Sequence, residues 1–386
     1  MVTQFRPTAS RTPKPKSSLR VECLEAREVP SVGVEDVASL PHLDGMSSSY
    51  PIADATISTI ALESHIGVPL LGTTRERFAV ASAAGERTTV NVYDSKTNAL
   101  LGILTPFGGA DTAGARVAVG DVTGDGIQDI VVSAGPGTAP VVKVFDGRTL
   151  TEVASFFAYD ESFLGGVYVA AGSVLNTGRA DIVTGAGENG GPHVKLFSGQ
   201  DIFPGNGIKP AVAPIAHASF FAVEADFRGG VSVAVADVNG DGYGDIVAGA
   251  GPGGGPRVVV VSGKDGSRLE DFFAYDANLR SGVMVAAGTL DATGLAKIVT
   301  LPMAGGADVK VFDAGRVVAT YQPFGANGAG TGVAVRDLDG TGRDDILVTN
   351  GLGTTPRVVV LDGSTGQKLR DFPGLTPDYV GGLFVG

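Results

Sequence analysis

The 386-residue chain has one cysteine, Cys23, so its body contains neither a disulfide nor a zinc site built from thiolates. No apolar run reaches the roughly 18 residues that a membrane-spanning helix needs, so no transmembrane segment is expected. The chain has four histidines, none at metal-ligand spacing from another: His42, His65, His193 and His217. It also lacks a Gly-x-Ser-x-Gly sequence, a P-loop and a His-Glu-x-x-His sequence. No catalytic constellation is therefore visible.

The charge of the chain is unevenly distributed. The net charge is −12, but residues 1–30 carry six Lys/Arg against three Glu, so the remainder carries −15. An acidic body argues against nucleic-acid binding, which needs a basic face, and it suits a chain with cation sites. Glycine is abundant, at 58 residues, but has no triplet period, so a collagen-like structure is excluded.

The N-terminal region lacks the patterning of a folded domain. Residues 1–35 are predicted to be a disordered basic targeting segment, and residues 36–75 a linker or lead-in. No apolar stretch of a secretory signal is present. Five residues resemble a short N-terminal motif of planctomycete exported proteins: Leu24, Glu25, Arg27, Pro30 and Ser31. The resemblance implies an extracellular or cell-envelope location. The alternative is a short charged helix before a linker.

A nine-residue loop at 237–245 has the pattern of a cation site. Oxygen-bearing side chains stand at its positions 1, 3, 5 and 9: Asp237, Asn239, Asp241 and Asp245. A Ca²⁺ ion needs about six to eight oxygen ligands, and the carbonyl of Tyr243 is the natural backbone ligand. An EF-hand would need Glu at position 12, where Ala248 stands, so the loop joins two strands instead. The alternative is an Asp/Asn/Gly turn without metal.

The same frame recurs in four other places. Two copies keep the pattern, with candidate ligands Asp121, Thr123, Asp125, Ile127 (carbonyl) and Asp129 in one, and Asp337, Asp339, Thr341, Arg343 (carbonyl) and Asp345 in the other. Threonine at 123 and 341 lowers the expected affinity. Two copies are eroded, and we expect no metal in them. One keeps only Asp181, and the other has Lys297 at position 9, where an ammonium group opposes a divalent ion and can replace it.

These loops each join two strands in a repeated unit of four short strands. The first position of the loop falls at 121, 173, 237, 289 and 337, and the long second interval holds an inserted loop at 203–210. Four strands per unit with turns between them predict the blade of a β-propeller. The fold class is therefore all-β, with antiparallel four-stranded blades over residues 76–386.

The two ends of the repeat region predict the number of blades. Residues 78–85 and 90–94 match the second and third strands of a blade, and residues 381–386 match a first strand. A ring closed by pairing N- and C-terminal strands in one blade gives six blades. If residues 67–71 form a first strand of their own, the number is seven.

The repeated Asp-x-(Asp/Asn)-x-Asp-Gly-x-x-Asp loop between two strands resembles the FG-GAP/VCBS repeats of integrin-α-like propellers. The family's name-giving signatures are only partly present, as in Gly249-Ala-Gly-Pro252. The resemblance implies a propeller whose loops on one face bind Ca²⁺ through the residues named above. Aromatic residues near the blade ends, Tyr159, Tyr275 and Phe324, are expected in the core between blades rather than as platforms for sugars.

Three hypotheses for function remain. The first is a non-catalytic calcium-binding propeller of the cell envelope or exterior, serving adhesion or the binding of a protein or glycan. The second is a polysaccharide-active lyase or hydrolase with its site in the central channel, since fold alone does not decide function. The third is a bare scaffold in a surface layer.

Overall fold

The structure is a computed structural model that describes residues 76–204, 214–304, 306–326, 328–351, 353–376 and 378–386. The chain divides into two compact units, Met1–Val68 and Pro69–Gly386, and all described residues belong to the second. The predictions for the N-terminal segment, the linker and the alternative first strand at 67–71 lie outside the described residues.

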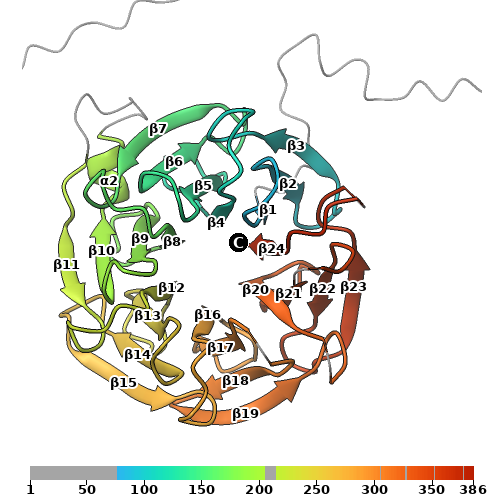
Figure 1. The fold of residues 1–386 in the computed structure, drawn as a ribbon. Helices are drawn as coiled ribbons and strands as arrows, with labels where there is room; N and C mark the ends of the chain where they lie inside the picture. Colours follow the sequence, from blue (N-terminus) through green and yellow to red (C-terminus); the bar gives the residue numbers. More distant parts are fainter. Residues whose placement is uncertain (1–75, 205–213, 305, 327, 352, 377) are drawn as a thin grey trace, which may run out of the picture. The chain divides into compact units, whose positions relative to one another are not determined.

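The strands of the described residues form six four-stranded antiparallel sheets, arranged as the blades of a propeller around a centre (Figure 1). In the first half of the chain they are β1 (Arg77–Ser82), β2 (Val90–Asp94), β3 (Leu100–Leu104), β4 (Ala115–Gly120), β5 (Asp129–Ala134), β6 (Val141–Phe145), β7 (Glu152–Phe157), β8 (Val167–Gly172), β9 (Asp181–Ala186), β10 (His193–Phe197) and β11 (Ala218–Phe221).

In the second half they are β12 (Val231–Ala236), β13 (Asp245–Ala250), β14 (Arg257–Val261), β15 (Arg268–Phe273), β16 (Val283–Gly288), β17 (Lys297–Pro302), β18 (Val309–Asp313), β19 (Arg316–Tyr321), β20 (Gly330–Arg336), β21 (Asp345–Asn350), β22 (Val358–Leu361), β23 (Lys368–Phe372) and β24 (Leu383–Val385). Blade 1 has the order β24-β1-β2-β3, and blades 2 to 6 follow in chain order from β4 to β23. The prediction of a six-bladed propeller is confirmed.

The ring is closed by strands from opposite ends of the propeller region. The inner strand of blade 1 is β24, which pairs antiparallel with β1 in the register Val80↔Val385. The carbonyl of Leu383 also accepts hydrogen bonds from the hydroxyls of Thr331 and Thr349 in blade 6, at 2.8 and 2.7 Å. The closing strand is therefore bonded both within its own blade and to the preceding one.

The hydrophobic core lies between blades, as six clusters that each join two neighbouring blades. Small residues let the sheets approach: a Cβ added at Gly185 of blade 3 would lie 2.3 Å from the carbonyl oxygen of Val231 in blade 4. Tyr159, Tyr275 and Phe324 pack against these clusters, as expected. Blade packing thus explains the repeated Val/Ala/Gly pattern of the inner strands.

The inserted loop predicted at 203–210 is preceded by one helical turn, α2 (Gly199–Ile202). Ile202 and Phe203, which follow β10, are fully buried in the core between blades 2 and 3. The described part of this insertion therefore adds to the core. No helix in the described ranges is long and apolar enough to cross a membrane.

We expect Leu383→Ala to lower the free energy of unfolding by about 3 kcal/mol, because it leaves a cavity in the core of the closing blade. The Leu383 side chain is 0% exposed and packs with Phe78 and Val358. Val380→Ala, at a side chain 49% exposed, is the matched control and should change stability little. Denaturant unfolding measures both. Equal effects of the two substitutions would show that closure contributes little.

Candidate functional site

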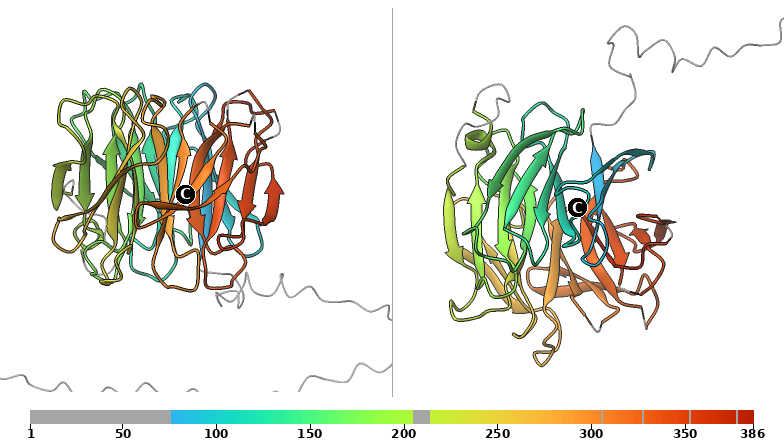
Figure 2. Two further views of the ribbon diagram at one scale, coloured as in Figure 1. Left: turned by 90° about the horizontal axis from the view of Figure 1, so that it is seen from below. Right: turned by 45° about the horizontal axis from the view of Figure 1, so that its top comes forward.

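The loops between the first and second strands of the blades gather at one end of the ring. The inner strands β4, β8, β12, β16 and β20 take the same place in blades of the same strand order. The loops that follow them therefore lie on the same face of the ring. Figure 2 shows the ring from the side, with its connections at the two ends. The three loops with intact patterns follow β4, β12 and β20 of blades 2, 4 and 6. They are therefore spread around one face.

The aspartate at position 1 organises each intact loop. Asp237 Oδ1 accepts hydrogen bonds from the backbone N–H groups of Gly240 and Asp241, at 2.7 and 3.2 Å, and its Oδ2 accepts one from Gly242 at 2.9 Å. Gly240 and Gly242 have φ values of 77° and 85°, which glycine adopts at little cost. Asp121 and Asp337 make the same kind of contact within their loops. The first carboxylate thus folds the loop around itself.

The aspartate at position 9 ties the loop to the rest of its blade. Asp245 is fully buried and accepts hydrogen bonds from Val238 N–H in the loop and from Gly263 N–H in the turn between strands three and four, at 3.0 and 3.2 Å. Asp129 likewise accepts from the N–H groups of Thr123 and Gly147, at 2.8 and 3.0 Å. The role of these two glycine N–H groups could not be read from the sequence.

Burial makes the ionised form of these carboxylates costly. It raises the pKa of Asp129 to about 6, although the N–H groups of Thr123 and Gly147 act in the opposite direction. Burial also raises the pKa of Asp345 to about 6, and the nearby charges of Asp339 and Asp337 add to this effect. Negative charge is therefore concentrated in the loops and is incompletely compensated by the protein.

The loop of blade 6 has the spacing of a cation site. Carboxylate oxygens of Asp337, Asp339 and Asp345 all lie within 4.8 Å of one another, and this is the one acidic trio with that spacing in the described part of the chain. In blade 4, Asp245 is buried and Asp237 and Asp241 are partly buried. Burial raises the pKa of Asp245, and the charges of Asp241 and Asp237 act in the same direction. The blade 4 loop therefore also carries negative charge near a buried carboxylate.

Other oxygens in these loops are available to a cation. The Thr123 hydroxyl, at position 3 of the blade 2 loop, is buried and lies near the position 9 carboxylate of Asp129. Within the described ranges, the position 7 carbonyl oxygens of Ile127, Tyr243 and Arg343 accept no hydrogen bond. One competitor is present: Arg148 Nη2 lies 3.4 Å from Asp125 Oδ2. The oxygen donors suit a hard cation such as Ca²⁺.

The two eroded loops differ at position 9: blade 3 keeps the aspartate, and blade 5 has a lysine. In blade 3, Asp181 keeps the position 9 contacts and accepts hydrogen bonds from the N–H groups of Val174, Leu175 and Gly199. In blade 5, the Lys297 side chain is only 4% exposed, and its Nζ lies 3.0 Å from Asp313 Oδ2 and 3.6 Å from Asp291 Oδ2. Blade 5 therefore holds a positive charge of its own inside the loop.

Position 9 carries a buried ionisable residue in every described blade. The residue that begins the second strand is Arg77, Asp129, Asp181, Asp245, Lys297 and Asp345 in blades 1 to 6. Each of the two cations lies near an aspartate at the end of the third strand of its blade. Arg77 Nη1 is 3.8 Å from Asp94 Oδ2, and Lys297 Nζ is 3.0 Å from Asp313 Oδ2. Arg77 could not be recognised as a position 9 residue from the sequence, because no loop pattern precedes it.

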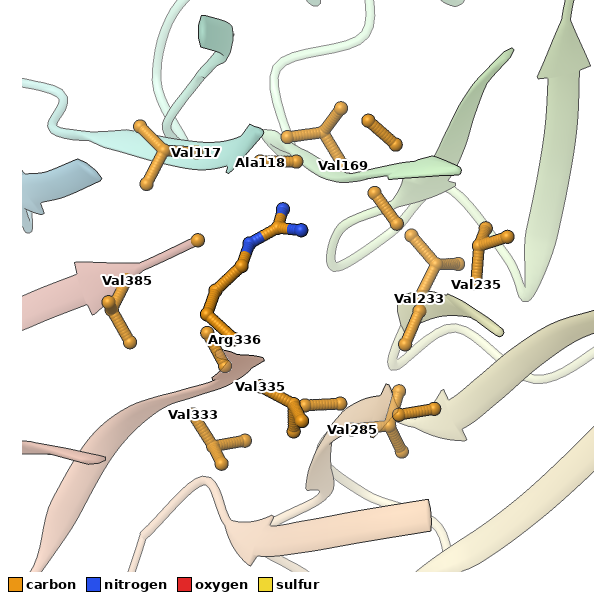
Figure 3. A pocket seen from close by; sticks show the side chains of 17 residues that line it. Val117, Ala118, Val169, Val233, Val235, Val285, Val333, Val335, Arg336 and Val385 are labelled. Atoms are coloured by element: carbon orange, nitrogen blue, oxygen red, sulfur yellow. The ribbon is translucent and has the colours of Figure 1, made fainter. Parts of the chain in front are cut away.

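The central channel contains a cavity of about 100 Å³ (Figure 3). Its described lining consists of Val, Ala and Gly from the six inner strands, with Arg336 as the single charged side chain. A channel enzyme would need several converging polar groups. The lining described here does not contain such a group of carboxylates, histidines and lysines.

The loop geometry agrees with a comparison against protein families. The repeat family described as FG-GAP matches residues 113–149 and 229–266, which include the loops of blades 2 and 4. The chain carries FG-GAP repeats. The loop of blade 6 lies outside the two matched segments.

Comparison with solved structures finds matches of low sequence identity and low TM-score. A Bacteroides caccae protein of unknown function is 10% identical, with a TM-score of 0.44, over 80% of this chain and 98% of that one. Two structures of the COPII coat on membranes are 12% identical, with TM-scores of 0.42, over 67% of this chain and 63% and 35% of theirs. A comparison with curated proteins finds no match.

We expect Asp181→Asn to lower the free energy of unfolding by about 1–3 kcal/mol with or without calcium. The amide keeps one acceptor oxygen but places an NH₂ group where a carboxylate oxygen now accepts a backbone N–H. Asp226→Asn, at an exposed side chain, is the control. Denaturant unfolding with calcium and with chelator measures the effect. A loss seen only in calcium would show that blade 3 binds metal after all.

Lys297→Met should also destabilise the propeller, by about 1–2 kcal/mol, because the nearby carboxylates of blade 5 lose their cation. Calcium should not restore the lost stability, because position 9 then offers no oxygen. Lys96→Met removes an exposed ammonium and serves as the control. Thermal melts at several calcium concentrations test this, and full rescue by calcium would contradict it.

Proposed function

We propose that this chain is a non-catalytic, calcium-binding β-propeller of the cell envelope or exterior that binds a protein or glycan ligand. The acidic trio in the blade 6 loop carries the proposal, because its oxygens already lie at mutual distances that suit one cation. FG-GAP repeats in two further blades support it, since their loops have the same frame. An exterior location suits calcium sites of modest affinity.

The proposed ligands are the oxygens of the three intact loops. They are Asp121, Thr123, Asp125, Ile127 (carbonyl) and Asp129; Asp237, Asn239, Asp241, Tyr243 (carbonyl) and Asp245; and Asp337, Asp339, Thr341, Arg343 (carbonyl) and Asp345. A bound Ca²⁺ ion would neutralise carboxylates that the fold holds together. The loops would then be stabilised in the conformation that the first and ninth carboxylates already impose through their hydrogen bonds.

A binding role accounts for the channel better than an enzymatic one. The described lining consists of Val, Ala and Gly with one guanidinium group, whereas a lyase or hydrolase needs an acid, a base and groups that position a sugar. The connections at the two ends of the ring give broad surfaces for a partner (Figure 2). A glycan and protein array, probed with and without calcium, identifies the ligand.

Calcium should raise the melting temperature, because it binds the folded state in preference to the unfolded chain. At 100 times the dissociation constant, each site adds about 2.7 kcal/mol. The double substitution Asp337→Asn with Asp339→Asn should reduce this calcium-dependent gain by one site. Asp291→Asn, in the loop that holds Lys297, should lower stability without changing the gain.

The measurement is a thermal melt in calcium and in chelator, with elemental analysis of the purified protein. No difference between the two melts, together with no bound calcium, would contradict the proposal. A loss of the gain in Asp291→Asn equal to that in the double variant would instead place the ion elsewhere.

A further inference from the structure

Arg336 is the one charged side chain in the described lining of the channel. It is the last residue of β20, and its guanidinium points into the middle of the ring of Val and Ala side chains (Figure 3). Nη2 donates a hydrogen bond to the carbonyl of Val119 on β4. β20 and β4 belong to blades 6 and 2, so the side chain reaches past the inner strand of blade 1.

The positive charge of Arg336 is incompletely compensated. No described carboxylate lies within 4.0 Å of its guanidinium, although Asp344 and Glu76 act on it from farther away. Burial lowers the pKa of the Arg336 guanidinium, and those two carboxylates oppose the shift. Among the described residues Nε has no hydrogen-bond partner, and Val119 is the only residue that accepts a hydrogen bond from the group.

Arg116 on β4, the inner strand of blade 2, shows how the same charge is stabilised elsewhere. Its guanidinium carbon lies 4.1 Å from the ring centre of Tyr168 and 5.1 Å from that of Phe384. Two aromatic faces thus attract the cation. The described lining of the channel around Arg336 consists of Val, Ala and Gly and contains no such ring. A buried guanidinium with one hydrogen bond is a site where an anion would be stabilised.

The donors of the guanidinium suggest which anion it would bind. Nε has no hydrogen-bond partner among the described residues, and Nη2 uses one of its two hydrogens on Val119. A guanidinium presents parallel N–H donors that match the two oxygens of a carboxylate. We propose that the channel binds a small monocarboxylate, such as acetate or propionate, with its carboxylate on Arg336.

Isothermal titration calorimetry of the calcium-loaded protein with sodium acetate, sodium propionate and sodium chloride, at constant ionic strength, tests the proposal. We expect millimolar binding of the carboxylates, because so small a ligand makes few contacts. Chloride, which cannot accept two parallel hydrogen bonds as a carboxylate does, should bind more weakly than either.

Arg336→Met should abolish carboxylate binding while keeping a side chain of similar length in the channel. Arg316→Met removes an exposed arginine on β19 and should leave binding unchanged. If Arg336→Met does not fold, Arg336→Lys keeps the charge but loses the planar pair of donors, and it should weaken both carboxylates.

Three results would overturn the proposal: no heat with the wild-type protein, equal affinities for chloride and propionate, or unchanged binding in the Arg336 variants. Because the loops and the channel are tested by different ligands, a failure here is distinguishable from a failure of the calcium proposal.

Discussion

A buried charge at the start of the second strand is the constraint around which each blade is built. In four blades it is an aspartate whose oxygens accept hydrogen bonds from backbone N–H groups. Asp129, Asp181 and Asp245 each join their loop to the turn between strands three and four. Hydrogen bonds to a charged acceptor are stronger than neutral ones, so one side chain fixes two connections that are far apart in the sequence. The loop conformation follows from this contact.

The two remaining blades meet the same demand with the opposite sign of charge. Arg77 and Lys297 are buried at the equivalent position and lie near Asp94 and Asp313, respectively. A buried cation beside a carboxylate has an internal counter-charge, whereas a buried aspartate beside further aspartates lacks one. The ring thus combines blades that carry their own cation with blades whose charge favours a bound one. Blade 3 belongs to neither kind, because Asp181 accepts hydrogen bonds from backbone N–H groups but has no further carboxylates of the loop pattern beside it.

The sequence predicts the features of this protein that depend on spacing. The Asp/Asn/Gly pattern at 237–245 locates a loop between two strands, and its repetition gives the blades and the closure of the ring by β24. The role of Gly147 and Gly263 was not predictable in this way, because a backbone N–H has no residue signature. Arg336 was missed for another reason. Its direction into the channel depends on which face of β20 turns inward, and this is decided only when six blades pack together.

Closure also connects the loops to the channel. Arg336 ends β20, and the next residue, Asp337, is position 1 of the blade 6 loop. Asp344 in that loop accepts a hydrogen bond from Thr289 N–H of blade 5 at 2.7 Å, and its charge acts on Arg336. One short stretch of chain therefore supplies the charged group of the channel, the acidic trio of the blade 6 loop and a contact to blade 5. The position of Arg336 in the channel depends on the same β20-to-β21 connection that brings Asp337 and Asp345 together.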